Sequence, residues 1–326
     1  MRMFPRATTQ NRLDDHLPAD FGSLLDQVTA SSSPSAMSSL SFTSSGTFTT
    51  TPASSSPAEP PYLLPRDAQE QARQELTHYA LRGAFQRNHL APVDAPASVL
   101  DIGSGAGHWA MEIAHTFPDA YVLGIDIALP ETDEFFDSSH AGALRRPNNC
   151  SFMQCDALRP LPFAHESFAY THMRLMHLGI PVPSWPLVMN EVLRVTRMRG
   201  WVELVEGDLP RNGGPALDRL VSWLRELAYR RGIDPGMGSQ VGAWAHERGL
   251  HRMVAHEIEL PVGAYGGRLG NMLAAGVFAQ IEALRPALVT SGIAADAAFE
   301  HALMAARFEV MHAQCVQPLY IAYGQR

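Results

Sequence analysis

An apolar, strand-like segment that runs directly into a glycine-rich turn constrains this sequence more than any other feature. Residues 99–102 are apolar around one acid, residues 103–107 read G-S-G-A-G, and residues 108–116 have the pattern of a helix. Glycines lack a Cβ atom, so the turn can adopt positive φ angles and lie directly against a ligand. The following helix presents unpaired N–H groups at the same place. The unit predicts an α/β fold that binds a nucleotide-like ligand at this turn.

The spacing of the glycines separates two classes of cofactor. The turn follows the pattern GxGxG, and residue 108, where the dinucleotide fingerprint GxGxxG takes a small residue, is His. Asp101 at the end of the strand is placed to attract a cationic group, such as the methionyl part of S-adenosylmethionine. We therefore expect S-adenosylmethionine as the cofactor. The alternative, an NAD-dependent oxidoreductase, is weakened further because the sequence has no Tyr-x-x-x-Lys pair.

Two more acids follow apolar runs at the ends of the next two expected strands. Asp126, with Ile127 beside it, is placed to accept hydrogen bonds from ribose hydroxyls. Asp156, with Ala157 beside it, is placed to accept a hydrogen bond from the adenine amino group. Each acid alone is also compatible with an ordinary strand-end turn. Because all three acids, Asp101 included, would meet at one edge of an open α/β sheet, together they predict a ligand crevice there.

Apolar runs and helical patterns alternate from residue 98 onward, as in parallel βαβ units. We expect an α/β, Rossmann-like fold with a seven-stranded, mostly parallel sheet, helices on both faces and a helical insertion before the last strand. The expected strands lie near residues 98–102, 121–125, 151–154, 168–172, 201–206, 252–260 and 318–323. The expected helices lie near residues 66–88, 108–116, 215–231, 268–284 and 296–313. The first of these helices begins with a capping-box-like pair, Asp67 and Glu70.

The first sixty residues differ in composition from the rest. No charged side chain occurs between Asp26 and Glu59, and Ser, Thr and Pro dominate the segment. Such a sequence cannot bury enough apolar surface to offset its ordering entropy, so we expect residues 1–60 to form a disordered tail. Its many hydroxyls leave open a phosphorylatable regulatory arm. One folded domain is expected to follow, with a cap helix at 66–88, a cofactor core at 98–206, and acceptor-side helices and last strands at 207–326.

The charge and cysteine content exclude several classes of protein. The formal net charge is -8, and all 25 basic residues are Arg. A chain without Lys has neither a Schiff-base nucleophile nor a phosphate-loop lysine, and the negative charge argues against direct nucleic-acid binding. Three scattered cysteines favour a reducing compartment. Because no apolar run approaches membrane-spanning length, we expect an intracellular, cytoplasmic protein without membrane contact, with the nucleus as the alternative location.

On these motifs the chain resembles the class I S-adenosylmethionine-dependent methyltransferases, and among them the LaeA-like, or secondary-metabolism, type found mainly in fungi. The resemblance covers roughly residues 61–325. Its features outside the cofactor motifs are Tyr62, Asp67, Glu70, Arg73, Phe168, His172, Arg174, Trp185, Glu191, Arg194, Glu203, Glu206 and the closing run 320–324. The chain departs from the family at residues 198–200, where Met-Arg-Gly replaces the usual Pro-Gly-Gly turn, and at Ala169, which replaces an acid.

The resemblance implies transfer of a methyl group to an unidentified acceptor, either a small metabolite or a protein. It also leaves an alternative from another class, a regulatory or scaffold protein of secondary metabolism that retains the fold and acts by binding a partner protein. The residues expected to bind the cofactor are Asp101, Gly103, Ser104, Gly105, Gly107, Asp126, Ile127, Asp156, Ala157 and Met173.

Methyl transfer is an in-line displacement that needs collinear reactants in a site without water. A general base helps only where the acceptor must lose a proton. We expect His172 and Glu206 to be the catalytic residues, with His177 as a further candidate base. An equally good interpretation of His172 is a packed or hydrogen-bonded residue that supports Met173 beside the adenine. Arg174 is expected either to anchor an acidic substrate or to pair with Glu206.

Deletion of residues 1–58 is expected to leave both the melting temperature and the affinity for S-adenosylmethionine nearly unchanged, because the segment lacks the apolar content to join a core. Thermal unfolding and calorimetric titration of the full-length and truncated proteins measure the two quantities. A large drop in melting temperature would show that the segment packs on the domain. Loss of partner binding alone would instead support the regulatory-arm alternative.

Overall fold

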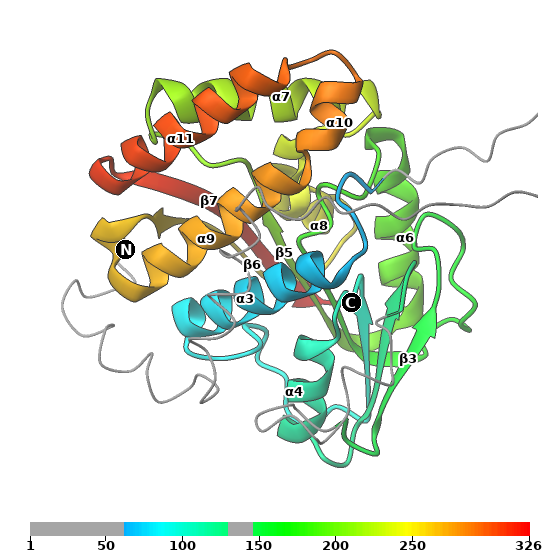
Figure 1. The fold of residues 1–326 in the computed structure, drawn as a ribbon. Coiled ribbons are helices and arrows are strands. Elements are labelled where there is room, and N and C mark those ends of the chain that lie inside the picture. Colours follow the sequence, from blue (N-terminus) through cyan, green and yellow to red (C-terminus); the bar gives the residue numbers. More distant parts are fainter. Residues whose placement is uncertain (1–61, 130–145) are drawn as a thin grey trace, which may run out of the picture.

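The fold is built on one seven-stranded sheet (Figure 1). The computed structural model describes residues 62–129 and 146–326, so the expected tail at 1–60 lies outside the described residues. The strand order is β3-β2-β1-β4-β5-β7-β6. β1 to β5 pair in parallel, and β7 pairs antiparallel with β5 and β6, which confirms the predicted fold class. The strands are β1 (Ser98–Ile102), β2 (Tyr121–Asp126), β3 (Cys150–Gln154), β4 (Phe168–Arg174), β5 (Thr196–Gly207), β6 (His251–Val262) and β7 (Cys315–Gln325).

The expected helical insertion before the last strand is present. Three helices separate β6 from β7: α9 (Gly267–Ala283), α10 (Arg285–Thr290) and α11 (Asp296–His312). The other α-helices within residues 62–129 and 146–326 are α3 (Ala68–Phe85), α4 (His108–Thr116), α6 (Trp185–Val195), α7 (Pro215–Arg230) and α8 (Val241–Glu247). The sequence patterns did not predict α6, α8 and α10. α8 and α10 have 7 and 6 residues, too few for a helical period to be recognised.

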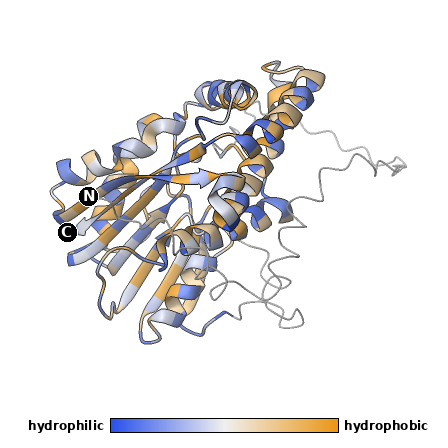
Figure 2. Cartoon of the chain, turned by 90° about the vertical axis from the view of Figure 1, so that its left-hand side faces the viewer, coloured by the Kyte–Doolittle hydropathy of each residue, from blue (hydrophilic) through white to orange (hydrophobic). Residues whose placement is uncertain are grey.

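Alternation along the strands sends successive side chains to opposite faces of the sheet. Val99 belongs to an apolar cluster with Trp109 of α4, whereas the next residue, Leu100, belongs to a cluster with Trp185 of α6. Apolar residues recur along the strands of the sheet and along the helices that cover it (Figure 2). The two faces of β1 are therefore covered by different helices, and both faces are buried.

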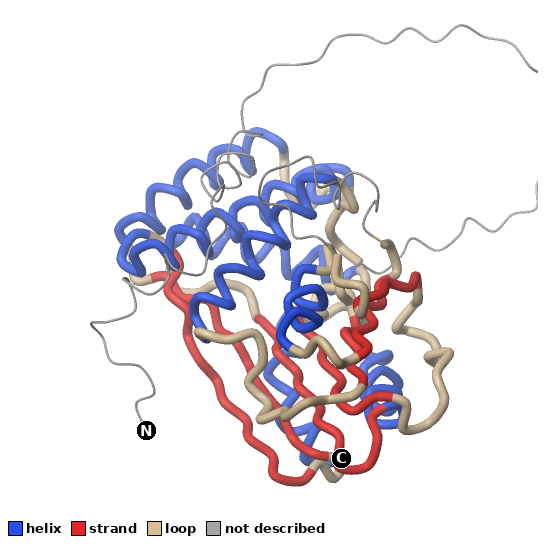
Figure 3. The backbone as a smooth tube through the Cα atoms, turned by 90° about the horizontal axis from the view of Figure 1, so that it is seen from below, coloured by secondary structure: helices blue, strands red, loops and turns tan. Residues whose placement is uncertain are grey.

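α3 covers the glycine-rich turn from the side opposite the sheet. The helix begins as predicted, because the side chain of Asp67 accepts a hydrogen bond from the Glu70 amide at 2.9 Å. It lies beside α9 (Figure 1). In Figure 3 a group of helices gathers at one end of the strands, and the C-terminus lies at the other. α3 lies at the end of the sheet where the expected ligand residues are, because Gln74 of α3 contacts Ala106 in the turn that follows β1.

The residues that depart from the family's usual turn lie inside β5. Arg199 has a φ of 63°, and the pairing of β4 with β5 shifts register between Phe168 and Tyr170. A Cβ atom on Gly200 would lie 2.9 Å from the carbonyl oxygen of Ala169, so a larger residue would force the two strands apart. This irregularity lies at the start of β5, whereas the end of β5 faces the α3 side of the fold.

The segment Ala264–Thr290, which contains α9 and α10, is more apolar than the sequence reading allowed. It includes an 18-residue window with a mean hydropathy of 1.4, long and apolar enough by composition to cross a membrane. The expectation that no run approaches that length is wrong here. Three charged residues interrupt the segment, Arg268, Glu282 and Arg285, so its apolar character was not recognised as one run in the sequence. In the fold, half (50%) of the window is buried, and α9 packs against α3 and β6 as a core helix does.

A buried histidine joins α3 to the neighbouring elements. His78 of α3 is 2% exposed; its Nδ1 accepts a hydrogen bond from Arg174 Nη2 at 3.1 Å, and its Nε2 lies 3.2 Å from Glu112 Oε2. Burial lowers the pKa of His78 from 6.5 to about 4, so the ring is neutral at pH 7 with its proton on Nε2. Burial alone would raise the pKa of Glu112, but bonds from His78, Arg82 and Asn88 lower it to about 2.

The free energy of unfolding is expected to fall as the pH is lowered from 6.5 toward 4, because the unfolded chain protonates His78 in this window and the folded chain does not. Above this window both states are neutral, and His78 contributes no pH dependence. Between about pH 7.5 and pH 5 the loss due to His78 is about 2 kcal/mol. Urea unfolding of wild type and His78→Gln at both pH values measures it. Equal pH dependence of the two proteins would refute the assignment.

Candidate functional site

A cavity of about 460 Å³ lies at the carboxyl ends of β1, β2, β3 and β4, beneath α3. This volume is in the range of small-ligand and cofactor sites. Most of the residues expected to bind the cofactor line it: Asp101, Gly103, Ser104, Gly105, Gly107, Asp126, Ile127, Asp156 and Ala157. His172 and Arg174 also line it. The structure therefore brings together residues from four strand ends, including the three at which the sequence predicted the acids Asp101, Asp126 and Asp156.

The glycine-rich turn has little room for side chains. Gly103, Gly105 and Gly107 have φ angles of 73°, 51° and 81°, a region that other residues rarely adopt. A Cβ atom on Gly107 would lie 2.5 Å from the ring of Phe152 on β3. The same ring lies 2.6 Å from the position of a Cβ atom on Gly124 of β2, which is paired with Phe152 in the sheet. The turn is thus seated closely on the first three strands.

Two polar side chains in and beside the turn are directed toward its backbone and the cavity. Asp126 accepts hydrogen bonds from the amides of Gly105 at 2.9 Å and Ala128 at 3.1 Å. Burial raises the pKa of Asp126, although both bonds oppose the shift. Ser104 Oγ is buried, and no residue within 62–129 or 146–326 forms a hydrogen bond with it. The turn therefore offers a ligand one unused hydroxyl and a carboxylate whose remaining lone pairs are free.

Asp156 occupies the more open end of the cavity. Its Oδ1 accepts a hydrogen bond from the Leu158 amide at 2.9 Å, and its Oδ2 lies 3.4 Å from Nε of Arg159. About a third of the side chain (32%) is exposed. The residue is therefore an ordinary turn acid that also borders the cavity, and its contact with an adenine amino group stays a prediction.

His172 is packed against two neighbours at the base of the cavity. Its Nδ1 lies 2.8 Å from Asp101 Oδ1, and its ring stacks on Trp109 with 3.6 Å between ring centroids and 7° between planes. The indole of Trp109 is held in turn by a hydrogen bond to the carbonyl of Asn88 at 2.6 Å. These contacts are those of a histidine that supports the site. A catalytic role for His172 stays a prediction.

Met173 and Glu206 do not line the cavity. Met173 follows His172 on β4, so it points to the opposite face, where it is fully buried in the cluster that contains Trp185. Glu206 is also fully buried, and its carboxylate binds the amides of Met176 and His177 beyond the end of β4. The expected pairing of Glu206 with Arg174 is not found, since Arg174 donates to His78 instead.

Three buried carboxylates act on Arg174 at the base of the cavity; Asp101 lines the cavity, whereas Glu112 and Glu203 do not. Asp101, Glu112 and Glu203 are 3%, 8% and 1% exposed, and the buried cation among them is Arg174. Burial lowers the pKa of Arg174, while the attraction of the three carboxylates opposes that shift. Arg82 neutralises part of the charge through its 2.6 Å bond to Glu112. A net negative formal charge remains, which favours a cationic ligand over an anionic one.

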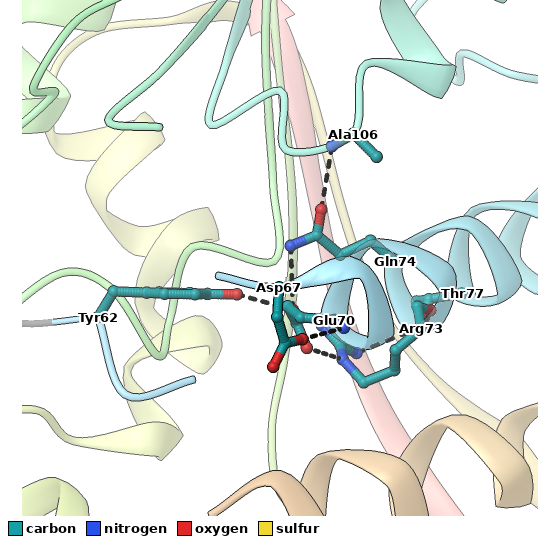
Figure 4. A network of polar contacts seen from close by, with 7 residues as sticks. All are labelled: Tyr62, Asp67, Glu70, Arg73, Gln74, Thr77 and Ala106. Atoms are coloured by element: carbon teal, nitrogen blue, oxygen red, sulfur yellow. Dashed lines mark hydrogen bonds and ion pairs between the residues drawn. The ribbon is translucent and has the colours of Figure 1, made fainter. Parts of the chain in front are cut away.

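α3 supplies the part of the site that the sequence reading missed (Figure 4). Glu70, which is 3% exposed, accepts hydrogen bonds from Tyr62 Oη at 3.0 Å, from Arg73 twice at 2.7 Å, and from Gln74 Nε2 at 3.0 Å. Gln74 Oε1 in turn accepts the amide of Ala106 at 3.0 Å. Gln74 therefore links α3 to the glycine-rich turn, since its Nε2 donates to Glu70 and its Oε1 accepts from Ala106.

A sequence signal for this contact exists. Glu70, Arg73, Gln74 and Thr77 are spaced i, i+3, i+4 and i+7, so they form one polar stripe on α3. A polar stripe on a helix that also has a buried face indicates a second buried or ligand-facing surface.

Comparison with known proteins decides the family. Residues 99–200 match the family model described as a methyltransferase domain. The chain is 30% identical over 221 residues to the N-methyltransferase sirN of Leptosphaeria maculans, covering 65% of this chain and 74% of that protein. The chain belongs to the S-adenosylmethionine-dependent methyltransferases.

The methyltransferase is also related to regulators of secondary metabolism. It is 32% identical over 172 residues to the secondary metabolism regulator laeA of Aspergillus flavus, covering 51% of this chain and 43% of the regulator. It is 32% identical over 161 residues to the protein-methionine methyltransferase laeA of Emericella nidulans, covering 48% of this chain and 40% of that protein. The predicted resemblance to the LaeA-like family is therefore confirmed.

The chemistry of the cavity fits S-adenosylmethionine, the cofactor of the family. The negative charge around Asp101 suits the sulfonium and ammonium groups, and the turn with its free Ser104 hydroxyl suits close approach of the methionyl part. Asp126 is expected to accept the ribose hydroxyls. Within residues 62–129 and 146–326 no three His, Cys, Asp or Glu side chains are placed to hold a metal ion.

Substitution of Asp126 by Ala is expected to weaken binding of S-adenosylmethionine at least tenfold, or about 1.4 kcal/mol, because the ribose loses its acceptor. The bonds to Gly105 and Ala128 are lost with it. Asn should lie between wild type and Ala, since it keeps one acceptor oxygen but places an NH₂ group against a backbone N–H. Calorimetric titration measures the affinities. Asp119→Ala, an exposed acid in the turn before β2, is the matched control; unchanged affinity in Asp126→Ala would mean that Asp126 is only a turn acid.

Proposed function

We propose that this methyltransferase acts on a small molecule. The supporting observation is that α3 closes over the cavity and is fastened to the glycine-rich turn through Gln74 and Ala106. An acceptor has to reach the methyl group between α3 and the sheet, where a folded protein surface does not fit.

The described residues account for binding and orientation of the reactants. S-adenosylmethionine, when bound, supplies an electrophilic methyl group on a sulfonium. The turn and Asp126 would hold the cofactor at the strand ends, while the carboxylates around Asp101 would balance its positive charge. α3 would shield the space above the sheet from water, which would favour an in-line displacement between two oriented reactants.

Untargeted mass spectrometry tests the proposal. The purified protein is incubated with S-adenosylmethionine and a protein-free extract of fungal mycelium, and the protein fraction of the same extract is treated in parallel. We expect a small molecule in the protein-free extract to gain the mass of one methyl group. The Asp126→Ala variant, assayed below its cofactor dissociation constant, should show at least tenfold less product.

The outcome of the parallel incubation separates the acceptor classes. Methylation confined to the protein fraction would overturn the small-molecule proposal and favour a protein acceptor, as for the Emericella nidulans relative, which is named a protein-methionine methyltransferase. Methylation in neither fraction, with intact cofactor binding, would favour a regulatory role over an enzymatic one.

A second candidate function is supported by the surface of α11. Met304, Phe308 and Met311 are 61%, 64% and 56% exposed, and their spacing places them on one side of the helix. An exposed apolar stripe of this kind suits contact with a partner protein. The candidate function is that of a regulatory or scaffold protein, the role named for the Aspergillus flavus relative. Methyl transfer by the purified protein without a partner would favour the enzymatic function.

A further inference from the structure

A second cavity lies beside the cofactor cavity, between α3, α9 and the ends of β6 and β7. We call it the α3–α9 pocket. Its volume is about 60 Å³, several times the space that one ordered water needs, and so enough for a ring or a short aliphatic group. Tyr62, Arg73, Thr77 and Leu175 line both cavities. A molecule in the α3–α9 pocket would therefore border the place where the cofactor binds.

The walls of the α3–α9 pocket are mainly apolar. They include Leu64, Leu81, Leu178, Leu260, Leu273 and Val277. Gly276, inside α9, leaves the middle of the pocket open, since a Cβ atom there would lie 3.5 Å from Thr77 Oγ1, in ordinary contact. Glycine in a helix interior is less stable than alanine by about 1 kcal/mol. The pocket thus lacks a side chain at a position where the helix would be more stable with one.

One polar group in this wall has the geometry of a general base. His177 is 6% exposed, and its Nδ1 lies 3.2 Å from the fully buried Glu206, which also binds the His177 amide at 2.9 Å. Within residues 62–129 and 146–326, Nε2 of His177 has no hydrogen-bond partner. Since Nδ1 faces the carboxylate, Nε2 is the ring nitrogen left to accept a proton from a ligand.

We propose that the α3–α9 pocket binds the methyl acceptor, and that His177, oriented by Glu206, takes its proton. The acceptor class is a small apolar molecule whose methyl-accepting atom carries a hydrogen, as in a phenol or another hydroxyl compound. This inference rests on the proposed small-molecule function and adds the site and the base. It assigns Glu206 a positioning role in place of the catalytic one expected from the sequence.

The proposed methyl transfer is a simple displacement. The acceptor oxygen forms a bond to the methyl carbon as the carbon–sulfur bond breaks, and the electron pair of that bond stays on the sulfur of S-adenosylhomocysteine. The acceptor proton moves to Nε2 of His177. Glu206 stabilises the imidazolium that forms, as a buried carboxylate does beside a histidine base. The proton is released to solvent after the product leaves.

The binding test uses 4-methylphenol as the probe and the protein saturated with S-adenosylhomocysteine. Saturation-transfer NMR and calorimetry measure the dissociation constant in wild type and in Gly276→Leu, whose added side chain would fill the pocket. Asn271→Leu adds the same side chain at an exposed position of α9 and is the matched control. We expect binding to wild type and to Asn271→Leu, and at least tenfold weaker binding to Gly276→Leu.

Two results would overturn the binding site: no binding of 4-methylphenol to wild type, or equal binding to Gly276→Leu. Melting temperature and affinity for S-adenosylhomocysteine are measured for every variant, so that unfolding is not mistaken for a filled pocket. If Gly276→Leu unfolds, Leu273→Phe fills the same space from a different position on α9.

The base is tested by the rate of formation of 4-methylanisole from 4-methylphenol. His177→Gln and His177→Asn are expected to lower this rate at least about 100-fold, while both dissociation constants change less than threefold. A rate of the variants within tenfold of wild type would overturn the proposal that His177 is the base. The proposal would also be overturned if wild type bound both molecules and formed no product. Failure of the proposed function would look different, because extract metabolites would then gain no methyl group in any variant.

Discussion

The hydrogen bond between the Ala106 amide and the Gln74 side chain sets the relation of α3 to the sheet, and both cavities depend on that relation. Gln74 is bound in turn to Glu70, which also binds Tyr62 and Arg73. Glu70 accepts four hydrogen bonds in all, three at Oε1 and one at Oε2. Tyr62 and Arg73 line both cavities, and both are bound by Glu70. Glu70 therefore holds side chains at the boundary between the cofactor cavity and the α3–α9 pocket. Loss of any of these bonds would leave a buried polar group unsatisfied.

The local chemistry of the strand ends made much of the site predictable. The turn needs glycine at positive φ whatever surrounds it, and acids at the ends of parallel strands meet at one edge because the strands run side by side. Asp101, Asp126 and Asp156 therefore reach the same cavity from segments far apart in the sequence. Their roles toward the cofactor follow from this placement and from the family, and stay predictions until they are tested.

Side-chain direction and tertiary packing were harder to predict. Met173 was expected beside the adenine. Successive side chains of a strand point to opposite faces of the sheet, and because His172 faces the cavity, Met173 faces away from it. Glu206 was expected to meet the reactants, but its partner His177 comes from the segment beyond β4, which no periodic pattern describes. The role of α3 depends on Gln74, a residue type that carries little sequence signal by itself.

The close packing of the glycine-rich turn against β3 limits which residues related sequences can carry at the positions in contact. The ring of Phe152 fills the space that side chains at both Gly107 and Gly124 would need. Gly107 is restricted by its φ of 81° as well, whereas Gly124 is restricted by that ring and by the Cβ atom of Ser104, which would lie 2.9 Å from a Cβ atom at position 124. An alanine at position 124 therefore needs a smaller residue at position 152, together with a small shift of Ser104. Across related sequences the two positions should change together, so that their pairing would be visible as covariation even where neither is invariant.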